Sequence, residues 1–217
     1  MVIYLDGIQG DGIINSTTMD LLKWDRGIMN HSLLDESIGK ELTTPHFLVD
    51  TLQKLYYGYG VNLGQDDFGN FITHGGGWPG YGNVLTRYIE DDITIIVLSN
   101  NSSWSETIQE AIANIWYNRP IVLPYKHEVA ITDPASLSLF NGKYKTRYWE
   151  FELVSEADTI VQIFKSGFKI KFIPESNSKL FSTRREDIQI EMLTASGHDP
   201  KFYMILYGVR DEMERLQ

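Results

Sequence analysis

The sequence predicts an α/β (α+β) domain, with an antiparallel sheet and packed helices, followed by an all-β antiparallel barrel domain. Two observations predict this division. Residues 1–124 hold 14 of the 18 glycines and carry 6 Lys or Arg against 15 Asp or Glu. Sustained period-two alternation of apolar and polar residues begins only after that point. We therefore expect the first domain at 1–118, a linker punctuated by prolines at 119–135, and the barrel at 136–217.

Helical signals open the first domain. Thr17 and Asp20 have the spacing of a capping box, and Leu21, Trp24 and Ile28 follow on one helical face. A second, shorter helix is expected over 36–42, where it stops before a proline.

Strands are expected in the middle of the first domain. They comprise an aromatic strand at 56–63, a turn at 66–70, and a three-stranded antiparallel meander of 71–75, 81–90 and 93–99. A third helix, at 103–116, should lie on this sheet through its apolar side, which carries Ile108, Ala111, Ile112 and Ile115.

Apolar residues in the second domain alternate with polar ones, as in strands with one buried face. Turn signals recur among these runs, so the pattern predicts roughly seven or eight short antiparallel strands. The alternating runs are 149–153, 168–172, 188–192 and 202–206.

Composition excludes several classes of protein. A formal charge of −10 and a pI of about 4.9 argue against nucleic-acid binding. The absence of cysteine excludes disulfides and thiolate chemistry but leaves the compartment open. No apolar run approaches the roughly 20 residues that span a bilayer. Residues 1–6 lack the basic start of a signal peptide.

The segment Thr73–Tyr81 (Thr-His-Gly-Gly-Gly-Trp-Pro-Gly-Tyr) is the most unusual local sequence. Glycines at the end of a strand permit close approach of a ligand and can leave amide N–H groups pointing outward. His74 adds a titratable donor beside them, which is what an oxyanion pocket requires. The alternative is a glycine-rich hairpin that carries a surface histidine.

Five segments, in this order, resemble the C-terminal half of class C β-lactamase-like serine hydrolases, a family that includes penicillin-binding proteins, D-aminopeptidases and esterases. The resemblance covers residues 7–118, and the region 136–217 resembles the lipocalin-like barrel that many of these proteins append. The segments are Gly10–Trp24, Leu42–Pro45, Tyr57–Gly60, Thr73–Tyr81 and Val97–Asn101.

This resemblance implies a role for each residue of the family's His-x-Gly motif. His74 would take the hydrogen-bonding or cationic position, Gly76 would let substrate lie along the strand, and Gly77 would donate one oxyanion N–H. The implied reaction is acyl transfer on a peptide, β-lactam or ester through a serine acyl-enzyme, without a cofactor. The family is often extracytoplasmic.

The family's Ser-x-x-Lys nucleophile and Tyr-x-Asn motif are not found upstream of His74. Ser37–Lys40 has the first spacing but lies on the short predicted helix, and Ser176–Lys179 lies in a predicted hairpin of the barrel. Tyr81–Asn83 has the Tyr-x-Asn spacing but follows His74, so we expect these residues to pack in the core or at its rim. The remaining histidines lack metal-site spacing, so no metal is predicted.

Two functional hypotheses follow. The chain is the C-terminal portion of a serine hydrolase, without the nucleophile and inactive alone, or a non-catalytic ligand-binding or interaction module that keeps a remnant of the fold. In either case we expect another strand to pair with the sheet edge at 93–97. This partner would be the strand Val2–Leu5, the same strand of a second copy of the chain, or a separate N-terminal segment.

Overall fold

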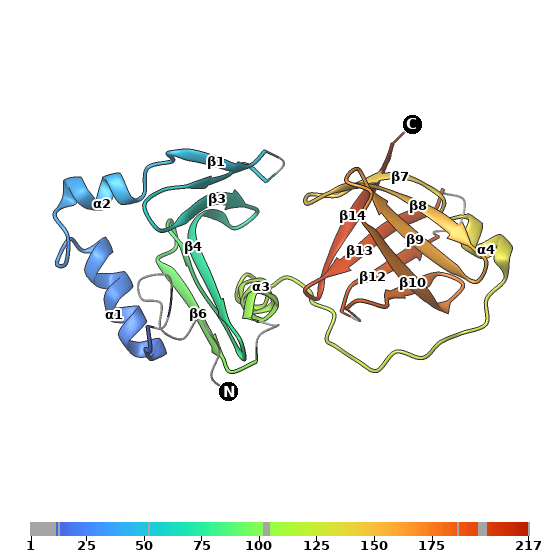
Figure 1. The fold of residues 1–217 in the computed structure, drawn as a ribbon, viewed down its shortest axis with the longest axis horizontal. Coiled ribbons are helices and arrows are strands. Elements are labelled where there is room, and N and C mark those ends of the chain that lie inside the picture. The colour runs from blue at the N-terminus through green and yellow to red at the C-terminus, as the bar shows by residue number, and fades with distance from the viewer. Residues whose placement is uncertain are drawn as a thin grey trace. The chain divides into compact units, whose positions relative to one another are not determined.

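A computed structural model describes residues 12, 14–51, 53–101, 105–185, 187–194 and 199–216. Its packing divides the chain into two compact units, Met1–Ala113 and Asn114–Gln217. Figure 1 shows the first unit as a sheet with helices and the second as a barrel, which confirms the predicted fold class. The described helices include none that is long and apolar enough to cross a membrane.

The first unit contains a six-stranded antiparallel sheet whose strands neighbour one another in chain order. The predicted meander forms its last three strands, and three further strands extend it. Val2–Leu5, one of the three partners expected beside β6, lies outside the described residues. The strands are β1 (Phe47–Asp50), β2 (Leu55–Tyr57), β3 (Asn62–Asp66), β4 (Gly69–Trp78), β5 (Tyr81–Tyr88) and β6 (Ile93–Ser99).

Both early helices are where the sequence predicts them. Helix α1 (Thr18–Met29) begins after Thr17, whose side chain accepts a hydrogen bond from the Asp20 N–H at 3.1 Å. Helix α2 covers Glu36–Leu42. The local capping signal and the proline that follows are enough to set these limits.

A buried ion pair fixes α1 to the sheet. Arg87 Nη1 on β5 lies 2.7 Å from Asp25 Oδ2, and both side chains are more than nine-tenths buried. The Thr94 hydroxyl on β6 donates to the same carboxylate oxygen at 2.8 Å. Asp92, at the turn before β6, accepts from both Arg26 and Arg87. These contacts connect the helix to two strands that lie more than 60 residues further along the chain.

The prediction of one aromatic strand at 56–63 is wrong. The structure has two strands there, β2 and β3, joined by a tight turn in which the Gly58 N–H donates to Val61 O at 2.8 Å. Gly60 adopts a left-handed φ of 77°. A Cβ on Gly58 would lie 2.3 Å from Leu42 O, so the chain reverses where only glycine fits.

The orientation predicted for the third helix is also wrong. Helix α3 covers Ser105–Trp116, but Ile108, Ile112 and Ile115 are exposed by 42%, 40% and 58%. Its buried positions include Ser105, Gln109 and Ala113. Polar residues suit that side because α3 faces a cavity lined by Thr73, Thr86 and Tyr88 of the sheet.

The second unit is a closed antiparallel barrel of eight strands, each paired with its neighbours in chain order, with β14 returning to β7. Alternate residues fill it, as the sequence predicts: Phe202, Met204 and Leu206 are buried on β13. The strands are β7 (Gly142–Lys145), β8 (Glu150–Glu156), β9 (Thr159–Phe164), β10 (Lys169–Ser176), β11 (Lys179–Ser182), β12 (Gln189–Leu193), β13 (Lys201–Leu206) and β14 (Val209–Leu216).

The one-turn helix α4 (Pro134–Ser138) leads into the barrel. Asp133 caps it by accepting from the Ala135 N–H at 3.0 Å. Leu137 and, just beyond the helix, Phe140 join the barrel core and are almost fully buried. The barrel is therefore filled partly by the segment that precedes its first strand.

The predicted linker lies along the barrel. The Val122 N–H donates to Gly208 O at 2.6 Å, and the Ala130 N–H donates to Pro174 O at 2.9 Å. The Tyr125 hydroxyl donates to Glu175 at 2.6 Å. Burial raises the pKa of the Tyr125 phenol, and this hydrogen bond raises it further. Residues 122–130 thus belong structurally to the second unit.

Candidate active site

The predicted site segment lies on β4, which is longer than its neighbour β3. The register of β3 against β4 ends at the pair Asn62–Thr73, whereas β4 and β5 stay paired to Trp78–Tyr81. Among the residues that the structure describes, the five residues 74–78 therefore pair with a strand on one side only. We call them the open segment of β4.

Hydrogen-bond parity determines which amides of the open segment face outward. In an antiparallel pair, alternate residues bond to the partner strand and the others point away from it. The Ile89 N–H donates to Asn70 O at 3.0 Å, so the even-numbered residues of β4 are the ones that bond to β5. The N–H groups of Gly75 and Gly77 accordingly point to the open side.

The His74 side chain is exposed on the open segment. Its Nε2 lies 3.2 Å from the hydroxyl of Tyr57 on β2, and the two ring centroids are 6.1 Å apart. The segment thus combines an imidazole with two outward amides, and such a set can polarise a carbonyl or hold an oxyanion.

The two glycines after Gly75 differ in their surroundings. A Cβ on Gly76 would lie 2.9 Å from Asn83 Oδ1, so glycine leaves room there for the Asn83 side chain. A Cβ on Gly77 would lie 3.8 Å from Tyr81 O, which is an ordinary contact. A side chain at position 76 would thus require the exposed Asn83 side chain to shift, whereas one at position 77 would fit without a shift.

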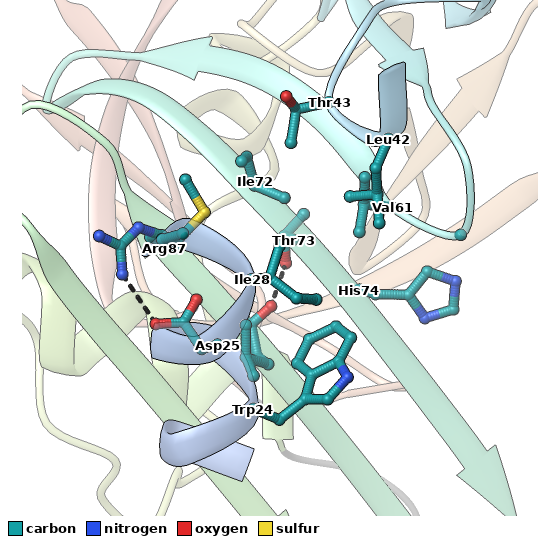
Figure 2. A pocket seen from close by; sticks show the side chains of 13 residues that line it. Trp24, Asp25, Ile28, Leu42, Thr43, Val61, Ile72, Thr73, His74 and Arg87 are labelled. Atoms are coloured by element: carbon teal, nitrogen blue, oxygen red, sulfur yellow. Dashed lines mark hydrogen bonds and ion pairs between the residues drawn. The ribbon is translucent and has the colours of Figure 1, made fainter. Parts of the chain in front are cut away.

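A cavity of about 70 Å³ lies beside His74, between α1 and the sheet. Figure 2 shows His74 and Trp24 on one side of it and the Asp25–Arg87 pair on the other. The walls between are largely apolar and include Ile28, Val61 and Ile72. Because the charged pair is mutually compensated, the cavity favours an apolar group.

A second, larger cavity, of about 270 Å³, lies between the sheet and α3. Asp66, Glu106 and Glu110 contribute carboxylates to its lining. Burial raises the pKa of the Tyr88 phenol far above its ordinary value, and the neighbouring charges of Asp66 and Glu110 add to that effect. Tyr88 is therefore a neutral donor that holds Asp66, with an O–O distance of 3.1 Å.

The two Ser-x-x-Lys runs considered in the sequence analysis lie where it expects them. Lys40 on α2 pairs with Glu36 at 2.7 Å, and Ser37 and Lys40 are both exposed. Ser176 ends β10 and accepts from the Ser178 N–H in the turn that follows. A further Ser-x-x-Lys run, Ser166–Lys169, which the sequence analysis missed, covers the turn between β9 and β10.

Tyr81 and Asn83 are exposed at the start of β5, and Asn83 lies against Gly76. Among the described residues, no three His, Asp or Glu side chains are grouped to hold a metal ion. Two neighbours of His74 were missed as site candidates. Tyr57 was noted only as part of a Tyr-Gly-Tyr-Gly run, and Gly75 has the same strand parity as Gly77, which could have identified it.

Comparison with known proteins places the chain in a family. The family model described as Beta-lactamase matches residues 2–117, more than half of the chain. Penicillin-binding protein 4* of Bacillus subtilis (strain 168) is 28% identical over 225 aligned positions, which cover 100% of this chain and 49% of that protein. The chain thus spans about half the length of this curated relative.

Two solved structures are also similar. A penicillin-binding protein from Bacillus halodurans is 30% identical, with a TM-score of 0.42, over 46% of this chain and 30% of that one. An octameric penicillin-binding protein homologue from Pyrococcus abyssi is 18% identical, with a TM-score of 0.46, over 92% of this chain and 47% of that one. By the extent of the family match, the chain belongs to the β-lactamase family.

Proposed function

We propose that this chain provides the His-x-Gly wall of an acyl-transfer site of the penicillin-binding-protein type, and that it does not hydrolyse substrates alone. The observation that carries the proposal is the open segment of β4, where the Gly75 and Gly77 amides point outward beside exposed His74. An extended acyl donor would pair with these amides as an added strand. Gly77 would then hold the developing oxyanion, and His74 would bond the substrate.

The nucleophile is the missing part. The Ser-x-x-Lys run that precedes His74 lies on α2, where Lys40 is paired with Glu36, and the other two runs lie at turns of the barrel. We therefore expect no hydrolysis of nitrocefin, p-nitrophenyl esters or D-amino acid amides above background. A burst of acylation by a fluorescent penicillin that disappears in Ser37→Ala would overturn this part.

Ligand binding tests the proposed role of the open segment of β4. An acetylated, amidated tripeptide in extended form, titrated into ¹⁵N-labelled protein, should shift the Gly75 and Gly77 amide signals. Gly77→Pro removes one donor, whereas the matched variant Gly77→Ala keeps it and adds a methyl group with ordinary contacts. Binding should weaken at least tenfold in the first variant and change little in the second. Equal binding by both variants would reject the oxyanion role of Gly77.

The alternative function, a binding module without catalysis, uses the same surface. The molecular mass of the protein in its source separates the two functions. A larger species that contains this sequence favours the hydrolase, because the chain spans 49% of its curated relative. A native species of 24.9 kDa favours the binding module.

A further inference from the structure

The hydrogen bond between Tyr57 and His74 determines which imidazole nitrogen faces a ligand. We infer that Tyr57 is a positioning residue whose hydroxyl donates to His74 Nε2 and keeps the imidazole proton on Nδ1. The inference rests on the proposed function for its purpose, since it names the donor that His74 presents. The hydrogen bond itself exists without any ligand.

Backbone contacts fix the position of Tyr57. Its carbonyl accepts from the His46 N–H at 3.0 Å, and the next residue, Gly58, closes the turn to Val61 at 2.8 Å. Tyr57 also pairs with Asn62, which in turn pairs with Thr73, the residue before His74. Strand pairing thus places Tyr57 in the row next to that of His74, and the two side chains, 17 residues apart in the sequence, meet in their 3.2 Å contact. Tyr57 is half-buried while His74 is exposed.

The chemistry of the two groups sets the direction of the bond. A neutral imidazole has one N–H donor and one acceptor nitrogen, and a partner at one nitrogen selects the tautomer. A phenol hydroxyl is a stronger acid than a neutral imidazole N–H, so the hydroxyl donates and Nε2 accepts. The proton then resides on Nδ1, opposite to the Nε2–H form that an exposed histidine prefers in water. Nδ1–H is then the donor that His74 can offer to a ligand.

Long-range ¹H–¹⁵N correlation spectra of the ¹⁵N-labelled chain test this directly. They are recorded without ligand at about pH 8.5, where histidine is ordinarily neutral. The His74 signals are assigned by their loss in His74→Gln. In the wild type, Nδ1 should show the protonated shift and Nε2 the unprotonated one, and in Tyr57→Phe the two shifts should exchange.

Tyr59→Phe is the matched control, because Tyr59 is exposed and its ring contacts His46 at a centroid distance of 4.7 Å. It should leave the His74 tautomer unchanged. An Nε2–H tautomer in the wild type, or an unaltered tautomer in Tyr57→Phe, would overturn the inference. If Tyr57→Phe does not fold, the wild-type spectrum decides alone. Loss of peptide binding with the Nδ1–H tautomer intact would reject the proposed function and leave this inference standing.

Discussion

The two units of the chain differ in whether their strand edges are paired. In the barrel, each of the eight strands has two hydrogen-bonded neighbours. In the sheet of the first unit, β1 has one neighbour among the described strands and carries three successive exposed apolar residues. Strand β4 extends five residues beyond its pairing with β3. Closure removes edges and favours stability, whereas an open edge keeps backbone groups available for a ligand.

The units also differ in what holds them together. The barrel core is continuous and apolar, with residues from α4 and all eight strands. In the first unit, a cluster around Val61, Leu63 and Ile72 is supplemented by the buried Asp25–Arg87 pair. The comparison predicts that apolar truncation harms the second unit and that charge removal harms the first.

Phe172→Ala should have the largest effect. Phe172 is fully buried in the barrel core, and its truncation should lower the free energy of unfolding of the second unit by about 3–5 kcal/mol. Denaturant titration followed by NMR amide signals of each unit measures this. The control Leu193→Ala, at a half-exposed position on β12, should cost about 1 kcal/mol or less. If Phe172→Ala destabilised the first unit as much as the second, the two units would not unfold independently.

Asp25→Ala should destabilise the first unit by about 1.5–3 kcal/mol, because it removes the buried carboxylate that accepts from Arg87 and Thr94, while Asp92 still pairs with Arg87. Adding Arg87→Met should recover part of the loss. The exposed pair Glu36–Lys40 provides the control, and Glu36→Ala should cost about 0.5 kcal/mol. If both acidic substitutions cost the same in urea unfolding, the ion pair does not hold α1 to the sheet.

Thr17→Ala removes the side-chain cap of α1 and should cost about 1 kcal/mol of stability in the first unit. Ser16→Ala is the control, since the Ser16 hydroxyl makes a contact of 3.5 Å with Thr17 O. The difference in urea midpoint between the two variants isolates the cap. Equal midpoints would show that tertiary contacts alone hold the start of the helix.

The smallest effect concerns pH. The hydrogen bond from Arg26 lowers the pKa of the Asp92 carboxyl, and the charge of Arg87 contributes. Because the folded pKa lies below the unfolded one, the stabilisation is present above the ordinary aspartate pKa of about 3.9 and is lost as pH falls through the folded value. Asp92→Asn should flatten this acid dependence in the first unit.

Asn is a suitable replacement because Asp92 has a φ of 55°, which Asn tolerates. Glu156→Gln, at an exposed position on the barrel, is the control and should leave the dependence unchanged. Unfolding midpoints measured from about pH 3 to 6 give the slopes. An unchanged slope in Asp92→Asn would assign the acid sensitivity to other groups.

The sequence predicted features that depend on neighbours along the chain. Capping at Thr17 and the proline after α2 set helix limits, and alternation predicted the barrel. Amphipathicity predicted α3 as a helix but predicted the wrong side toward the sheet, because a hydrophobic stripe does not identify its partner. The turn at Gly58 was missed because aromatic β-formers flank it on both sides.

The candidate site shows the same limit. His74, Gly76 and Gly77 form one local run, so the sequence alone suggests them as candidates. Tyr57 reaches His74 through the register of three strands, which no spacing rule gives. The direction of the Gly75 and Gly77 amides follows from the parity of β4 against β5, and their openness follows from the end of the β3 pairing at Thr73.

The unequal lengths of β3 and β4 have a consequence for how such a surface can change over time. Donors that belong to the main chain survive almost any replacement of a side chain, and only proline removes them. A ligand held by Gly75 and Gly77 would keep its anchor while residues around it, such as Trp24 or Asn83, were exchanged. Anchoring and selectivity would then reside in different parts of the polypeptide, so that selectivity could be altered without loss of the anchor.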